Sequence, residues 1–332
     1  MRILVGKGNH ILKFINLAVQ LISMNSKIKN ISFCLIFLIS LGTLGFTYNQ
    51  GKNNSSDNSG FSNDTAEKKI ASAKLSISEY QELKSRIALQ FKNAKPTQFG
   101  EFIKGVKVKI NTKEKLIALT FDACGGIGGS SYNADLINYL RKQKIPATLF
   151  ITGIWIDSNK KTFAQLASDT LFEIENHGFK HRLCSVNGAS VYGIKGTKNP
   201  EEVVDEMELN ARKIGQLTGK RPKFFRSATA YTDDVCVQIA AQLNLQIVSY
   251  SVLSGDAVAN TPANIISENI MKQIKPGSIM IMHFNHPAWK EKDALQLVIP
   301  KLKEMGYRFV RLEEFPLKGN FSDDNIKSPP NP

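Results

Sequence analysis

Residues 116–152 decide the fold, and they read LIALTFDACGGIGGSSYNADLINYLRKQKIPATLFIT. The apolar run Leu116–Phe121 predicts a short buried strand, and helical spacing predicts a helix over Ala134–Arg141. A second apolar run, Ala147–Thr152, follows Pro146 and predicts the next strand. A strand, a helix and a strand in this order are typical of a parallel βαβ unit.

The same alternation continues along the chain. Further strands are predicted over 171–174, 223–226, 246–251, 278–283 and 308–312, and helices over 200–217, 233–243, 262–273 and 293–305. An α/β fold of this kind, with roughly seven repeats, favours a closed or partly closed barrel. An open doubly wound sheet is the alternative. No GxGxxG opens a helix after a strand, so a dinucleotide site has no support.

Composition and charge narrow the function classes. The 332 residues are 42% hydrophobic and 22% charged, which excludes a mostly disordered chain. The formal charge is +14, and the first 50 residues hold five basic residues and no acidic ones, which leaves an excess of nine elsewhere. This excess favours an anionic partner. No Lys/Arg block with interleaved aromatic residues is present, so nucleic acid is not the expected partner.

The N-terminus predicts export. Residues 31–48 read ISFCLIFLISLGTLGFTY, carry no charge and follow Lys27 and Lys29. We interpret 1–48 as a secretory signal peptide or an uncleaved membrane anchor, with Met24 as an alternative true start. Either interpretation places the rest of the chain in the periplasm or outside the cell.

The segment after the leader is polar and then helical. Residues 49–66 are interpreted as a flexible linker. A helical segment is expected over 67–96, with an amphipathic helix from about 77 to 93, because Ser76 and Glu79 have capping-box spacing. The main domain is expected over 97–316, and 317–332 is expected to be a disordered tail.

Polar residues follow five successive predicted strands. Four of the five histidines belong to this set. The set consists of Asp122, His177, His181, Arg226, Asp256, His283 and His286. Each such residue by itself is commonly a helix cap or a structural group. In a parallel barrel, however, the carboxyl ends of the strands form the active site, so their joint occurrence favours function.

His177 and His181 are four residues apart. On a helical turn this spacing would place both imidazoles on one face, where both could bind one metal ion. Zinc is the expected metal, with cobalt or nickel as alternatives.

The motif order resembles the polysaccharide deacetylases, the NodB-homology group or carbohydrate esterase family 4. The order is T-F-D, H-x3-H, an F-R segment, Gly-Asp and an apolar strand that ends in His, over roughly residues 97–315. The resemblance implies a distorted (β/α) barrel. It also implies metal-dependent removal of N-acetyl groups from N-acetylhexosamine units of chitin, peptidoglycan or a related polymer.

The resemblance also implies a role for each matching residue. Asp122 corresponds to the catalytic base, and Arg226 to the arginine that holds it. His283 corresponds to the general acid, and Asp256 to the carboxylate that orients it. The backbone N–H of Thr229 falls at the position of an oxyanion donor. His177 and His181 correspond to the metal-binding histidines.

Three positions depart from the family pattern. Ala123 stands where the family has a metal-binding Asp, Gly178 replaces Ser or Thr, and Arg226 is followed by Ser-Ala-Thr in place of x-Pro-aromatic. Asp122 itself, Cys124 or His286 could supply the missing ligand, or the site could be inactive. An active variant is favoured because the acid and the base are retained, and the alternative is an inactive glycan-binding protein on the same fold.

Cys124 and Cys184 both lie beside predicted site residues. A disulfide between them is one interpretation for an exported protein. Metal ligation by a thiolate and burial as small residues are the others.

Overall fold

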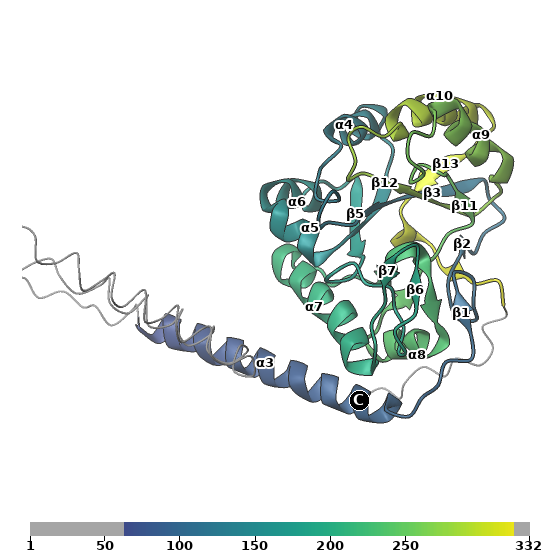
Figure 1. Cartoon of the computed structure of the whole chain (residues 1–332). Helices are drawn as coiled ribbons and strands as arrows, with labels where there is room; N and C mark the ends of the chain where they lie inside the picture. Colours follow the sequence, from purple (N-terminus) through teal and green to yellow (C-terminus); the bar gives the residue numbers. More distant parts are fainter. Residues whose placement is uncertain (1–62, 322–332) are drawn as a thin grey trace, which may run out of the picture. The chain divides into compact units, whose positions relative to one another are not determined.

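The computed structural model describes residues 63–321 (Figure 1). The chain divides into two units, Met1–Lys68 and Lys69–Pro332, and the second contains all of the strands described below. The predicted leader and most of the predicted linker lie outside the described residues. Within 63–321, no helix has both the length and the apolarity to cross a bilayer.

Helix α3 spans Asn63–Phe91. It therefore includes the last residues of the predicted linker, and Ser76 lies inside the helix rather than at its start. The helix contacts α7 (Pro200–Thr218): Tyr80 and Lys84 of α3 both bind the carboxylate of Asp205, which lies in α7.

Parallel strands form the centre of the main sheet. Their order is β10 (Gln246–Ile247), β8 (Phe224–Phe225), β5 (Phe172–Asn176), β4 (Ala147–Ile151), β3 (Leu116–Ala123) and β12 (Ser278–His283). Two further strands, β11 (Val252–Leu253) and β13 (Arg308–Val310), pair in parallel with β12 and β3. Two antiparallel strands, β2 (Lys109–Ile110) and β14 (Leu317–Lys318), complete the sheet. The domain thus continues past residue 316, where a tail was predicted.

The two sides of this sheet meet through the segment before β2. Lys107 donates its backbone N–H to Ile247 at the end of β10 and accepts a hydrogen bond from the N–H of Ser249, both at 2.8 Å. Because β2 belongs to the opposite end of the strand order, these bonds curl the sheet into a distorted barrel. This closure excludes the open doubly wound alternative.

Seven helices in the described chain follow or link the strands on the outside of the sheet (Figure 1). They are α4 (Ala134–Gln143), α5 (Gly153–Ser158), α6 (Lys160–Ala167), α7, α8 (Asp234–Gln242), α9 (Ala263–Gln273) and α10 (Glu291–Glu304). The short helices α5 and α6 were not predicted, because six and eight residues show little periodicity. Helix α7 matches its prediction: the Asn199 side chain caps its start, and Gly219 ends it at φ 72°.

Alternation along β3 separates the core from the site. Ile117, Leu119, Phe121 and Ala123 belong to the apolar core beneath the helices. Asp122 therefore faces the barrel interior, since successive strand side chains point to opposite faces.

Several short pieces complete the described fold. They are β1 (Phe99–Gly100) paired with β9 (Thr232–Asp233), β6 (Ser190–Val191) paired with β7 (Ile194–Lys195), and the 3-10 turns η1 (Ala228–Ala230) and η2 (Leu312–Glu314).

Candidate functional site

Strand register brings the predicted residues to one edge of the barrel. His283 pairs with Asp122 across β12 and β3. One step beyond the paired ends of β5 and β8, where Asn176 lies opposite Phe225, come His177 and Arg226. The carboxyl ends of four strands thus meet, as a parallel barrel requires.

A buried ion pair fixes the predicted base. The Arg226 guanidinium is fully buried and donates from Nη1 to Oδ1 of Asp122 at 2.8 Å. Its other groups donate to the carbonyls of Val248 and Ser249, and the guanidinium lies over the Phe150 ring. Burial alone would raise the pKa of Asp122, but Arg226 and the neighbouring imidazoles of the site hold that pKa below its usual value. Asp122 is therefore ionised at neutral pH.

The His177 ring is oriented by a backbone carbonyl. Its Nδ1 lies 2.9 Å from the carbonyl oxygen of Arg226, so Nδ1 carries the proton and donates it. The other ring nitrogen, Nε2, points toward the site, 3.7 Å from Oδ2 of Asp122 and 4.0 Å from Sγ of Cys124. A histidine held in this way is prepared to bind a metal through Nε2.

The two histidines converge without the helical turn that the spacing suggested. Residues 177–181 form a loop, His181 has φ 56°, and the two ring centroids are 5.0 Å apart. The helical expectation was wrong, although the predicted convergence of the rings is present.

Glu206 of α7 holds this loop and was missed by sequence reasoning. Its carboxylate accepts hydrogen bonds from the backbone N–H groups of Lys180 and Arg182, each at 2.9 Å. A Cβ at position 178 would lie 2.4 Å from Glu206 Oε1, and Gly178 has φ 90°. Glycine at this position is therefore explained by the carboxylate that fills the space. No local signal marks Glu206, because it is one of several acids on its helix.

The predicted acid forms a second pair. Nδ1 of His283 lies 3.2 Å from Oδ2 of Asp256, and the His283 backbone N–H donates to the same oxygen at 2.7 Å. Ser254 donates to the other carboxylate oxygen at 2.6 Å. Burial would lower the pKa of His283, but the Asp256 carboxylate raises it well above the ordinary value. The Asp256 carboxylate therefore favours the imidazolium form of His283.

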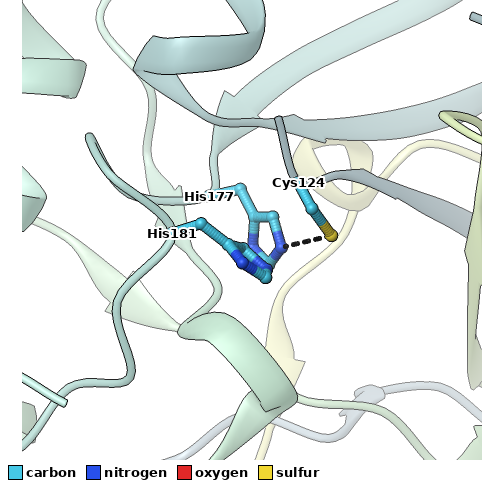
Figure 2. A group of neighbouring side chains, drawn as sticks. All are labelled: Cys124, His177 and His181. Carbon is cyan, nitrogen blue, oxygen red and sulfur yellow. Dashed lines mark hydrogen bonds between the residues drawn. The ribbon is translucent and has the colours of Figure 1, made fainter. Parts of the chain in front are cut away.

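Cys124 faces the two histidines (Figure 2). Its Sγ and one ring nitrogen each of His177 and His181 all lie within 4.8 Å of one another. Burial would raise the thiol pKa, but the imidazoles, chiefly His181 and His177, hold it well below the usual value. A divalent ion fits this donor set, because imidazole nitrogen and thiolate sulfur are ordinary ligands of zinc and cobalt.

The Cys124–Cys184 disulfide interpretation is wrong. Both residues are free thiols, and Cys184 packs in a second apolar cluster with Cys236 rather than at the site. His286 does not belong to the cluster of Cys124, His177 and His181. Its ring stacks on Trp289, with the ring centroids 3.9 Å apart.

Thr229 lies in the turn η1, directly after Arg226-Ser-Ala. It has φ 64°, and Ala230 follows at φ 60°, so two consecutive residues adopt left-handed backbone. The Thr229 hydroxyl is buried and finds no hydrogen-bond partner within residues 63–321.

A pocket of about 460 Å³ adjoins the acid pair. It is lined by Asp256, by residues 258–262 and by Ala288, Trp289 and Lys290. The pocket therefore lies on the Asp256 side of the pair, and His283 is not among its lining residues.

A barrel edge with a buried Asp–Arg pair, a two-histidine cluster and a His–Asp pair defines a hydrolase-type site. Comparison with known proteins agrees. Residues 109–248 match the sequence model of the polysaccharide deacetylase family, so the chain contains a polysaccharide deacetylase domain, as the motif order predicted. Related proteins of this class are hydrolases of amide C–N bonds.

Two relatives and one structure illustrate the similarity. A peptidoglycan-N-acetylglucosamine deacetylase of Bacillus cereus is 26% identical over 208 residues, which cover 62% of this chain and 90% of the relative. The peptidoglycan-N-acetylmuramic acid deacetylase PdaA of Bacillus subtilis is 27% identical, with 61% and 72% covered. A crystal structure of a CE4 family pseudoenzyme from Bacillus anthracis superposes with a TM-score of 0.52 at 24% identity, covering 64% of this chain and 69% of that one. The shared fold confirms the distorted (β/α) barrel.

Proposed function

We propose that this protein is an exported, metal-dependent deacetylase that removes N-acetyl groups from a glycan, most simply the N-acetylglucosamine units of peptidoglycan or a chitin-like polymer. The observation that carries the proposal is that a carboxylate suited to accept a proton and an imidazole suited to donate one lie at the same edge of the barrel. Asp122 is held ionised by Arg226, and His283 is held protonated by Asp256.

The two groups have the states that amide hydrolysis needs. Ionised Asp122 accepts a proton from the attacking water, and Arg226 keeps its carboxylate aligned. Protonated His283 donates its proton to the departing amine, and Asp256 orients the ring. The backbone N–H of Thr229 stabilises the oxyanion. His177 and His181 would hold a divalent ion, which would supply Lewis-acid polarisation of the carbonyl and lower the pKa of a water.

The substrate class rests on the relatives and on charge. Both relatives described above are named for peptidoglycan deacetylation. The basic excess of the chain suits an anionic wall polymer. Export is supported by the uncharged run at 31–48, and that segment would also hold an uncleaved chain at a membrane.

The test is acetate release from N-acetylglucosamine oligomers and from purified peptidoglycan. The full chain is assayed with added zinc or cobalt and with a chelator, and we expect release that the chelator abolishes. Asp122→Asn should abolish release while the protein still binds the glycan. Asp135→Asn is the matched control, because Asp135 is an exposed residue at the start of α4.

The results separate the two candidate functions. Binding of glycan by folded protein without release under any metal would favour the inactive glycan-binding alternative. Release that is indifferent to chelator would overturn the roles of His177 and His181.

A further inference from the structure

The family's second carboxylate ligand is missing, and its position cannot supply a substitute. Ala123 is fully buried in the apolar core beneath the helices, on the face of β3 opposite Asp122. A third protein ligand must therefore come from another residue, if the ion is to be held by more than two histidines.

Cys124 has the right direction. Side chains two residues apart share one face of a strand, so Cys124 follows Asp122 toward the barrel interior as β3 ends. Figure 2 shows its sulfur directed at the two imidazoles. Its Sγ is 4.0 Å from Nε2 of His177, and the three ligand atoms lie within 4.8 Å of one another.

The other two candidates are less suited. Oδ1 of Asp122 is bound by the Arg226 guanidinium at 2.8 Å, and Oδ2 lies 3.7 Å from Nε2 of His177. Asp122 is nevertheless absent from the group of possible ligands found among the described residues, and the proposed function needs it as the base. The His286 ring stacks on Trp289, and His286 is absent from the group of possible ligands found among the described residues.

We propose that Cys124 is the third protein ligand of the metal, in place of the carboxylate lost at Ala123. This inference rests on the metal of the proposed function, and it specifies a mixed thiolate–imidazole centre. Three protein ligands leave a fourth position open for water or substrate, which is the arrangement of catalytic zinc sites. A thiolate also makes the site softer, so zinc and cobalt should bind in preference to magnesium or manganese.

Cobalt binding to the full chain tests the proposal without reference to activity. Cobalt coordinated by a thiolate gives a sulfur-to-metal charge-transfer band in the near ultraviolet, and the bound thiol resists alkylation. We expect both signatures in the parent protein, unaffected by excess magnesium. Cys124→Ala and the near-isosteric Cys124→Ser should lose the band. They should also bind cobalt more than about 100-fold more weakly, since even outer-shell changes cost 10–100-fold.

Cys184→Ala is the matched control, because Cys184 is a free thiol buried in the second apolar cluster. It should keep the band and the affinity. Circular dichroism of each variant shows whether it is folded. If Cys124→Ala does not fold, Cys124→Ser is used for the same comparison.

Two results would overturn the ligand assignment. One is a band that survives in Cys124→Ser, and the other is cobalt bound by the parent protein with no band and with Cys124 still alkylated. The proposed function can fail separately. If the protein shows the band but releases no acetate, Cys124 is a metal ligand and the deacetylase function is wrong. If acetate release depends on metal but cobalt gives no band, the deacetylase function stands and the assignment of Cys124 as a ligand is wrong.

Discussion

Replacing Arg226 by Met tests the central ion pair. Met has similar length but no donors, so Asp122 would keep a buried negative charge with no cation beside it. Arg226 is 0% exposed and its Nη1 lies 2.8 Å from Asp122 Oδ1. Breaking a buried pair by removing one partner costs about 3–5 kcal/mol of the free energy of unfolding. For a domain of this size the loss corresponds to a fall in Tm of about 6–20 °C.

A double-mutant cycle separates the pair from the other contacts of Arg226. The carbonyls of Val248 and Ser249 lose their donors in any Arg226→Met protein. Asp122→Asn removes the charge but keeps the shape. We therefore expect Arg226→Met to cost less when Asp122→Asn is already present, with a coupling energy of about 1.5–3 kcal/mol, the range for hydrogen bonds to charged groups.

The same pair predicts a pH dependence with a definite sign. The pKa of Asp122 is lowered in the fold, so its contribution to stability is present above the pKa of the unfolded carboxyl and is lost as pH falls through the folded value. The gap between the parent and Arg226→Met should therefore narrow in acid. Urea unfolding at pH 7 and at about pH 3 measures both effects, because only the lower pH lies below the ordinary pKa of an aspartate. A coupling energy below about 0.5 kcal/mol at pH 7 would refute the reasoning, since neighbours in contact should not be additive.

Three further predictions concern residues around the candidate site. Gly178→Ser should lower the free energy of unfolding by about 1–3 kcal/mol, because φ 90° and the Glu206 carboxylate both oppose a side chain; urea denaturation measures it. Asp256→Asn should move the alkaline limb of the kcat profile to lower pH, because the Asp256 carboxylate raises the His283 pKa; an unmoved limb would contradict this role. Burial raises the pKa of Glu291 to about 8, so the free energy of unfolding of the parent falls as pH rises from about 4.5 to 8. Glu291→Gln lacks this titration, so the difference in Tm between the variant and the parent should shift in favour of the variant over that range, as thermal melts would measure.

The sequence by itself determined the α/β class, most of the strands and which residues meet at the candidate site. These follow from local patterns: apolar runs such as Leu116–Phe121 mark buried strands, and residues after parallel strands share one edge. Asp122, Arg226, Asp256 and His283 were singled out in this way, and the structure places them in the two pairs that the family resemblance implied.

Only the tertiary structure decided how the barrel closes and what supports the histidines. Closure depends on Lys107 meeting Ile247 and Ser249, which are about 140 residues away along the chain. Glu206 holds the 177–181 loop from a helix that begins after it, so neither the glycine at 178 nor the carboxylate is explained by its own neighbours in sequence. Such contacts depend on which surfaces pack together, and hydrophobic periodicity does not encode that information.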